Sequence, residues 1–305
     1  MARFRDSVLQ PLPSRLPADT ETATKALGHE QFIGDILARS RKMSPARVER
    51  ILAHQRENGT RFGQAAVALG YATEEDVLTA LAQQFHYPIA TAEQRKLAPE
   101  LVALNDPFSR QAEVFRSIRS QLLVNVFGEQ AGQRRALAIV SPSAGEGKTF
   151  FAANLGVTLA QLAGRTLLVD ADLRGPRLHK VFNLSNNAGL SGILSGRSES
   201  RLVKQVSVPG LFLLPLGITP PNPLELVERP TFGLLIHELI SKFDHVVVDT
   251  SAAQYGADAA VVAAKCGAAL VVVRKHSSRM AALQELSETL NRNAGTTSSV
   301  VLNEF

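Results

Sequence analysis

The stretch Ser141-Pro-Ser-Ala-Gly-Glu-Gly-Lys-Thr149 decides the fold of this 305-residue chain. It follows the apolar segment Ala136–Val140 and leads into residues Thr149–Ala163, which we expect to be helical. Glycines in such a loop let backbone N–H groups point at phosphate oxygens, and the following helix presents its positive end to the anion. A lysine and a threonine at the end of the loop supply a phosphate contact and a magnesium ligand. The sequence therefore predicts a phosphate-binding loop.

Three aspartates stand at the ends of later apolar segments. Asp170 and Asp172 close the segment that starts at Thr166, and Asp249 closes the segment that starts at His245. Parallel strands present their carboxyl ends to a ligand, so these carboxylates should face the phosphates. We expect one of Asp170 and Asp172 to hold magnesium through water and the other to accept the proton of an attacking hydroxyl. Asp249 is predicted to be a second magnesium-holding carboxylate.

Apolar segments alternate with longer spacers from Arg135 onward. The predicted strands are Ala136–Val140, Thr166–Asp170, Leu211–Pro215, His245–Asp249, Ala268–Val273 and Ser299–Leu302. The two longest spacers, Thr149–Ala163 and Arg279–Arg292, are predicted to be helices. Continuous apolar strands separated by helices indicate an α/β fold with a mostly parallel sheet covered by helices on both faces.

Composition narrows the function classes. No run of about 18 apolar residues is present, the first residues lack a secretory signal, and the single Cys266 suits the cytoplasm as a small core residue. Seven scattered histidines predict no zinc site. A net charge of +5, without a basic run interleaved with aromatics, predicts no nucleic-acid partner but permits contact with anionic lipid.

A small all-helical domain is predicted before the α/β domain. Residues 32–84 hold two copies of one pattern offset by 29 positions, so that Gly34 matches Gly63 and Gln55 matches Gln84. In each copy a short helix should lead to a second one. We expect a disordered arm over 1–29, the helical repeat over 30–87, a proline-containing linker over 88–110 and the α/β domain over 111–305, whose first helix runs from about Gln111 to Val126.

Further motifs lie on either side of the phosphate loop. Upstream, Glu113, Arg116 and Arg119 share one helix face; downstream stand Pro220-Pro-Asn-Pro-Leu-Glu-Leu226 and Asn303. With the loop and the aspartates, these residues resemble the bacterial tyrosine kinases of polysaccharide export, a branch of the deviant phosphate-loop ATPases. The resemblance covers about residues 108–305. It is strongest to the chain-length-determinant tyrosine kinases of exopolysaccharide loci, the EpsG type.

The resemblance implies an ATP- and Mg²⁺-dependent protein tyrosine kinase that controls exopolysaccharide chain length. It implies that an inner-membrane chain-length protein recruits the chain to the membrane, that a protein tyrosine is the substrate and that subunits form a ring through Glu113, Arg116 and Arg119. An exposed Glu–Arg pair within one helix is the plainer interpretation of that triplet. The implied catalytic residues are Lys148, Asp170 and Asp172, and the implied metal ligands are Thr149, Asp170 and Asp249. The implied nucleotide contacts are Ser143, Ala144, Gly145, Glu146, Gly147, Lys148, Thr149, Phe150, Arg174 and Asn303, the last toward the adenine.

Departures from the family pattern leave two alternatives open. Pro142 replaces the usual first glycine of the loop, and Thr250-Ser251-Ala252 replaces Thr-Pro-Pro. The family often ends in a tyrosine-rich tail, whereas this sequence has only Tyr71, Tyr87 and Tyr255. One alternative is a partition-type ATPase that only hydrolyses ATP, although that branch usually carries a lysine at the position of Ser143. The other is a nucleotide-gated scaffold.

The helical repeat resembles the amino-terminal domain of type II secretion and pilus ATPases, some of which bind cyclic di-GMP. The positions that match this pattern are Gly34, Gln55, Arg61, Gly63 and Gln84. The first copy departs from it, with Phe32 for the arginine and Arg41 for the second glycine. Dinucleotide binding and protein docking are both compatible with the sequence.

Overall fold

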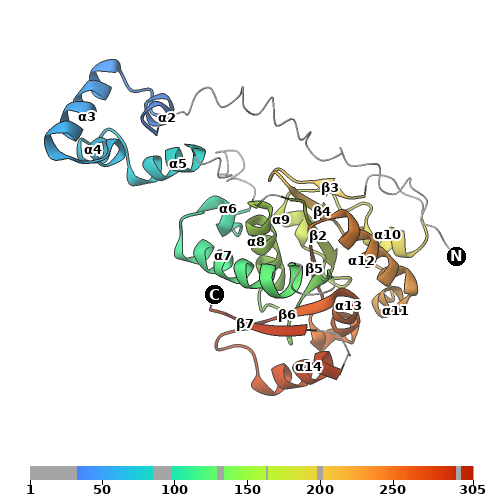
Figure 1. Ribbon diagram of the computed structural model, residues 1–305. Helices are drawn as coiled ribbons and strands as arrows, with labels where there is room; N and C mark the ends of the chain where they lie inside the picture. Colours follow the sequence, from blue (N-terminus) through green and yellow to red (C-terminus); the bar gives the residue numbers. More distant parts are fainter. Residues whose placement is uncertain are drawn as a thin grey trace. The chain divides into compact units, whose positions relative to one another are not determined.

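The computed structural model describes residues 33–84, 98–128, 134–162, 164–197, 202–292 and 297–304 (Figure 1). The chain divides into two compact units, whose described parts are residues 33–84 and residues 98–304. The predicted arm over 1–29 and residues 88–97 of the predicted linker lie outside the described residues.

The first unit is all helical. A short helix precedes a longer one in each copy of the repeat, in the order α2 (Ile33–Ser40), α3 (Pro45–Asn58), α4 (Phe62–Ala68) and α5 (Glu74–Gln84). Proline at the first position of α3 and acidic residues in the first turn of α5 agree with the expected helix starts. Equivalent residues of the two copies, Leu37 and Ala66, are fully buried in one shared core. The two copies therefore pack as one small domain.

Helix packing explains the repeated glycines. A Cβ atom on Gly63 would lie 2.7 Å from Cγ1 of Val77, and one on Gly34 would touch the ring of Phe62. Arg41, which replaces the second glycine of the first copy, forms an ion pair with Asp76 of the second. Gly63 thus lets α4 approach α5 closely within the second copy, whereas Gly34 is in ordinary contact with Phe62 of that copy.

The second unit is built on a seven-stranded sheet with the order β3-β4-β2-β5-β1-β6-β7. All neighbouring strands are parallel except β3 and β4. The strands are β1 (Ala136–Val140), β2 (Thr166–Ala171), β3 (Lys204–Gln205), β4 (Leu211–Leu214), β5 (His245–Thr250), β6 (Gly267–Arg274) and β7 (Thr297–Asn303). The six predicted strands are confirmed with ends that differ by at most two residues, and the short strand β3, which pairs with β4 antiparallel, was not predicted.

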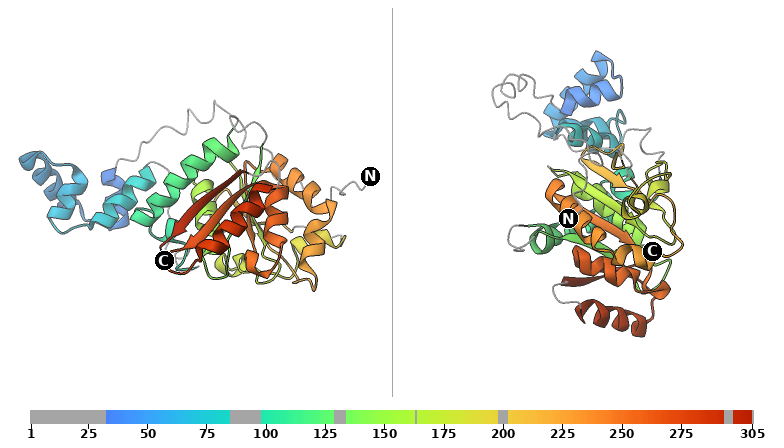
Figure 2. Two further views of the ribbon diagram at one scale, coloured as in Figure 1. Left: turned by 90° about the horizontal axis from the view of Figure 1, so that it is seen from below. Right: turned by 90° about the vertical axis from the view of Figure 1, so that its right-hand side faces the viewer.

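Helices cover both faces of this sheet (Figures 1 and 2). Helix α8 packs on the central strands of one face with α6 and α7 against it, and α12 and α13 cover the other face. The helices are α6 (Val102–Asn105), α7 (Arg110–Leu122), α8 (Lys148–Ala160), α9 (Leu178–Val181), α10 (Leu190–Leu194), α11 (Pro223–Glu228), α12 (Pro230–Lys242), α13 (Asp258–Cys266) and α14 (Met280–Arg292). A π-helical turn, Leu123–Phe127, extends α7, and a 3₁₀ turn, Ala253–Tyr255, follows β5. The predicted α/β fold is confirmed.

The described part of the predicted linker belongs to the core of the α/β unit, so the sequence prediction is wrong there. Leu101 and Leu104 are buried in the same cluster as α8. Asn154 of α8 accepts a hydrogen bond from the backbone N–H of Ala103 (3.0 Å) and donates one to the carbonyl of Glu100 (2.9 Å). Burial of these leucines and pairing of the backbone by a buried amide outweigh the turn-forming tendency of the nearby prolines.

Two further features concern membrane-spanning helices and the single cysteine. In the described residues, no helix combines the length and apolar character needed to cross a bilayer. Cys266 is buried and unpaired, and burial raises the pKa of its thiol. It therefore acts as a small apolar residue, as predicted.

Candidate functional site

The phosphate loop connects β1 to α8 and has the backbone that its glycines allow. Gly145 and Gly147 have φ of 77° and 97°, the left-handed region that side chains with a Cβ rarely adopt. Gly147 caps α8, so the first free N–H groups of this 13-residue helix open onto the loop. Nζ of Lys148 is nearly buried and donates to Oγ of Ser141 (3.0 Å), which holds the ammonium over the loop.

Two buried aspartates lie side by side at the carboxyl ends of neighbouring strands. Asp170 of β2 is in register with Asp249 of β5, and both are fully buried. Burial raises the pKa of Asp249 to about 7, against the opposing effects of the Thr149 hydroxyl and Lys148. Burial, together with the charges of Asp249 and Asp172, raises the pKa of Asp170 well above its usual value. A cation between the strands and a triphosphate would relieve this repulsion.

Asp170 and Asp172 differ in what they touch. Both carboxylate oxygens of Asp170 accept backbone N–H groups, from Asp172 (3.3 Å), Arg177 (3.2 Å) and Leu178 (3.1 Å). Asp170 therefore fixes the turn after β2 and the start of α9. Asp172 accepts from the N–H groups of Arg174 and Gly175 through one oxygen and lines the cavity above the loop.

The residues present fit a magnesium ion. Oγ1 of Thr149 donates to Oδ2 of Asp249 (2.7 Å), while Oδ1 of Asp249 is buried and has no hydrogen-bond partner among the described residues. No cluster of three or more carboxylate, histidine or cysteine side chains suited to a metal occurs within the described ranges. That agrees with magnesium at a nucleotide site, which takes one or two protein ligands and completes its shell with water and phosphate oxygens.

A cavity of about 580 Å³ lies above the phosphate loop. Its lining is Ala144, Gly145, Gly147, Lys148, Thr149, Asp172, Arg174, Gly175, Arg177, Ala252 and Tyr255. Arg174 is held at its wall because its Nε donates to Asp258 (2.6 Å), a buried residue of α13. The cavity thus gathers cations, loop N–H groups and one half-buried carboxylate, the groups that bind and transfer a phosphoryl group.

Two predicted nucleotide contacts lie in a neighbouring groove. Phe150 and Asn303 line a groove of about 510 Å³ between α7, the start of α8 and the end of β7, whereas Ser143 lines a different hollow. The amide of Asn303 donates to the carbonyl of Glu146 (3.0 Å). A Cβ on Gly147 would lie 2.4 Å from that amide nitrogen, so this glycine is required for β7 to approach the loop. The groove is apolar and adjoins the loop.

Glu146 ties the phosphate loop to the segment after β6, a role that the sequence did not reveal. Its side chain is buried and accepts from the N–H of Ser143 (3.1 Å) and from Oγ of Ser278 (2.5 Å). Ser278 in turn accepts from the N–H of Arg274 (2.7 Å). Nothing in the sequence distinguishes Ser278 from the serine beside it, because the contact joins residues 132 positions apart.

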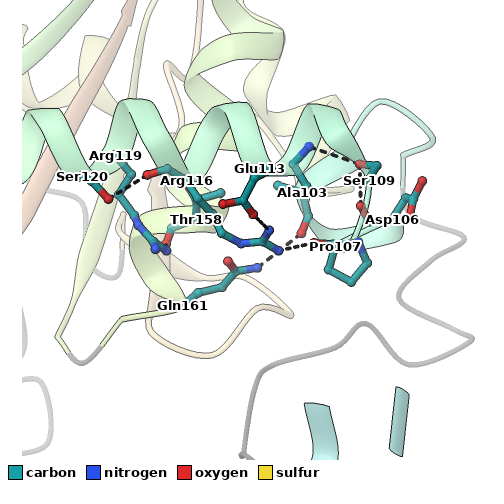
Figure 3. A network of polar contacts seen from close by, with 11 residues as sticks. Ala103, Asp106, Pro107, Ser109, Glu113, Arg116, Arg119, Ser120, Thr158 and Gln161 are labelled. Atoms are coloured by element: carbon teal, nitrogen blue, oxygen red, sulfur yellow. Dashed lines mark hydrogen bonds and ion pairs between the residues drawn. The ribbon is translucent and has the colours of Figure 1, made fainter. Parts of the chain in front are cut away.

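The arginines of α7 contact their own chain (Figure 3). Arg116 pairs with Glu113 (2.5 Å) and donates to the carbonyl of Pro107, and Nη1 of Arg119 donates to the carbonyl of Thr158 in α8 (2.7 Å). The side chain of Glu113 is 71% exposed. The two arginines thus fasten α7 to the α/β unit, whereas the carboxylate remains on the surface.

Comparison with known proteins establishes the family. Residues 137–305 match the model of the CobQ/CobB/MinD/ParA nucleotide binding domain. CapB of Staphylococcus aureus is 31% identical over 215 residues, which are 70% of this chain and 93% of CapB. The tyrosine-protein kinase YwqD of Bacillus subtilis is 33% identical over 58% of this chain and 74% of its own length. This chain belongs to the bacterial tyrosine-protein kinase family.

Longer relatives and solved structures agree with that family. Tyrosine-protein kinase ptk of Acinetobacter johnsonii is 28% identical over 95% of this chain, but the match spans only 37% of ptk. The crystal structure of the chimeric protein CapA2B2 matches with a TM-score of 0.62 at 29% identity. The match covers 76% of this chain and 99% of CapA2B2. The kinase domain of Escherichia coli ETK gives a TM-score of 0.60 at 28% identity, over 67% of this chain and 81% of that domain.

The candidate dinucleotide residues of the helical domain do not gather at one place. Gln55 lines a hollow beside Gly59, whereas Gly63 lines another beside Val77. The backbone N–H of Arg61 donates to the side chain of Gln64 (3.0 Å), a bond that caps α4. Arg61 thus has a structural role in the helical domain, and Gln55 and Gly63 line different hollows.

The hydrogen bond from Ser278 to Glu146 predicts that Ser278 affects the affinity of this chain for nucleotide. Replacing Ser278 with alanine is expected to raise the Kd for ATP about tenfold, because a hydrogen bond to a charged group contributes about 1.5–3 kcal/mol. Isothermal calorimetry measures that Kd, and Ser277→Ala, a change at the exposed neighbouring residue, is the control. Equal affinities for both variants and the unaltered protein would contradict the role of this bond.

Proposed function

We propose that this chain is an ATP-dependent protein tyrosine kinase of polysaccharide export. The observation that carries the proposal is the position of Asp172, which lines the cavity together with Lys148 and Thr149. A tyrosine hydroxyl has a pKa of roughly 10, so a carboxylate beside it raises its reactivity at neutral pH. An enzyme that only hydrolyses ATP needs no carboxylate placed to accept the proton of a tyrosine hydroxyl. Family membership supports the same activity.

The nucleotide is held by the loop and the strand ends. Backbone N–H groups of residues 144–149 bind the phosphates, and Nζ of Lys148 contacts the β and γ phosphates. Thr149 and Asp249 would hold magnesium, which supplies charge that neutralises the transferring phosphoryl group when bound. The groove beside Phe150 and Asn303 accepts the adenine, since it is apolar, adjoins the loop and carries an amide.

The acceptor hydroxyl enters from the side of Asp172 and Arg174. The carboxylate of Asp172 accepts its proton, and the guanidinium of Arg174, oriented by Asp258, stabilises negative charge on the phosphoryl oxygens. Asp170 positions the turn after β2 and does not accept the proton, because both its carboxylate oxygens already accept hydrogen bonds from backbone N–H groups. The proposal thus gives the proton-accepting role, which the sequence left open between the two aspartates, to Asp172.

The proposal extends to partners. An inner-membrane chain-length protein would recruit and activate the chain, and the helical domain would dock a protein of the export machinery or bind cyclic di-GMP. Subunits would assemble through α7. In that assembly Glu113 is the residue of the triplet available to a neighbouring subunit, since it is exposed while Arg116 and Arg119 bind backbone carbonyls of their own chain.

The α7 triplet predicts two separable effects. Arg119→Ala is expected to lower stability by about 1–3 kcal/mol, because it removes the partner of the Thr158 carbonyl in α8. Glu113→Ala is expected to change the thermal midpoint little, because an exposed ion pair contributes about 0–1 kcal/mol, yet to shift the oligomer toward monomer. Thermal unfolding and sedimentation velocity with ATP and Mg²⁺ measure the two effects. An unchanged oligomer in Glu113→Ala would remove α7 from the proposed interface.

Mass spectrometry of a reaction with ATP, Mg²⁺ and a glutamate–tyrosine copolymer tests the proposed activity. Phosphotyrosine on the copolymer is expected. Steady hydrolysis without any phosphotyrosine would instead support the partition-type ATPase. Nucleotide-dependent assembly without turnover would support the scaffold.

A further inference from the structure

Tyr255 stands in the wall of the cavity that holds Lys148 and Asp172. It ends the 3₁₀ turn after β5, and its side chain is 50% exposed. Its hydroxyl makes no hydrogen bond to any residue in the described part of the chain. A tyrosine that served only to fill space would be buried, with its hydroxyl satisfied. Here the phenol reaches the cavity with its oxygen available.

The turn that carries Tyr255 is fastened to the phosphate loop. The N–H of Ala253 donates to the carbonyl of Ser141 (2.9 Å), and the N–H of Gln254 donates to the carbonyl of Pro142 (3.0 Å). Thr250 at the end of β5 donates to the carbonyl of Ile139 in β1 (2.7 Å). Two of these hydrogen bonds join the turn to the first residues of the phosphate loop, and the third joins the end of β5 to β1, so the turn that carries Tyr255 is held beside the loop.

A cation lies on the other side of the turn. Gly256 has φ of 148°, and a Cβ there would lie 3.2 Å from a guanidinium nitrogen of Arg174. The Nε of Arg174 is held by Asp258 (2.6 Å), so the guanidinium remains beside the turn. A phosphorylated tyrosine carries a charge of about −1.5 to −2 and pairs readily with arginine. The site therefore suits both the reacting phenol and its phosphorylated product.

Tyr71, the other described tyrosine, lacks this placement. The sequence contains three, Tyr71, Tyr87 and Tyr255. Tyr71 belongs to the helical domain, where the guanidinium of Arg47 lies 5.4 Å from its ring centre and Arg50 contacts its hydroxyl. Tyr87 lies outside the described residues. Among the described tyrosines, Tyr255 is the one that lines the nucleotide cavity.

We propose that Tyr255 is a phosphate acceptor of the chain's own nucleotide site, which rests on the kinase function proposed above. Its Oη forms a bond to the γ phosphorus of ATP, and the bond from that phosphorus to the β,γ-bridging oxygen breaks. The electron pair of that bond leaves with ADP, and the phenolic proton passes to the Asp172 carboxylate and then to water. Holding both reactants in one cavity replaces a bimolecular encounter, which favours transfer within one chain.

Phosphosite mapping of the full chain after incubation with ATP and Mg²⁺ tests the proposal. Phosphate is expected on Tyr255 in the unaltered protein and in the matched control Tyr71→Phe, and it should be absent from Lys148→Met. Tyr255→Phe should lose at least about tenfold of the incorporated phosphate, the scale of a lost primary acceptor. The rate per molecule should not change when the protein is diluted tenfold, since the transfer is intramolecular.

Three results would overturn the proposal, and a copolymer substrate in the same reaction separates them. Copolymer phosphorylation with unmodified Tyr255 rejects Tyr255 as acceptor and leaves the kinase function intact. Hydrolysis with neither the copolymer nor Tyr255 modified rejects the kinase function and the acceptor together. A Tyr255 phosphorylation rate that rises in proportion to protein concentration rejects transfer within one chain.

Discussion

Replacing Lys148 with methionine is expected to lower the rate of phosphoryl transfer by about 10²–10³, the typical effect of removing one preorganised electrostatic contact to the transition state. The ammonium is nearly buried and held over the loop by Oγ of Ser141. A methionine fills similar space without the charge, so the loss falls on the stabilisation of the phosphates. Phosphotyrosine formation on a glutamate–tyrosine copolymer measures the rate.

The same substitution at another lysine gives the control. Lys242→Met removes an ammonium of α12 that pairs with Glu238 in the same helix, away from the cavity lining. It is expected to leave the rate of transfer unchanged. Circular dichroism should show that both variants keep the α/β fold. A Lys148→Met protein that retains the full rate would refute the role of the loop lysine and the assignment of the site.

The strand and loop pattern could be predicted from the sequence because its signals are local. Strands such as β2 and β5 are buried on both faces and read as continuous apolar runs, and their terminal aspartates mark the carboxyl edge of the sheet. The glycines and the Lys-Thr pair of the loop need positive φ values and a helix start, which the structure confirms at Gly145 and Gly147. The predicted strand ends differ by at most two residues.

Contacts between distant segments could not be predicted in this way. The segment around Leu101 looks like a linker locally, but its leucines pack in the core and Asn154 of α8 pairs its backbone. The bond between Ser278 and Glu146 joins two loops that the sheet brings together. Asp170 and Asp172 look equivalent in the sequence. Only the fold of the turn into α9 decides that both oxygens of Asp170, but one oxygen of Asp172, accept backbone N–H groups.

Replacing Asp249 with asparagine is expected to stabilise the nucleotide-free protein at pH 8 while abolishing magnesium-dependent phosphoryl transfer. Burial raises the pKa of Asp249 from 3.8 to about 7. A carboxyl group whose pKa is higher in the folded state favours folding when protonated. This stability is fully present below the unfolded pKa and is lost as pH rises through about 7. Above that pH the folded protein holds a buried charge, which the neutral amide avoids while still accepting from Thr149.

Thermal unfolding without nucleotide at pH 5.5 and pH 8 measures this effect. The unaltered protein should lose stability at the higher pH, and Asp249→Asn should lose less, because Asp170 still titrates in its buried site. One pKa unit corresponds to about 1.4 kcal/mol, so relief of at least that size at pH 8 should raise the midpoint by about 3–6 °C. Glu238→Gln, a carboxylate-to-amide change on α12, should leave both midpoints unchanged.

Magnesium and ADP complete the test, because a ligand that binds the folded state raises the midpoint, and raises it more the tighter it binds. Magnesium and ADP together should stabilise the unaltered protein at pH 8, since the cation neutralises the Asp249 carboxylate, whose charged form burial disfavours. Asp249→Asn should gain less from magnesium, although it starts from a higher midpoint. A variant that is less stable than the unaltered protein at pH 8 would contradict the penalty of the buried charge. A variant that responds fully to magnesium would show that the buried carboxylate does not hold the metal.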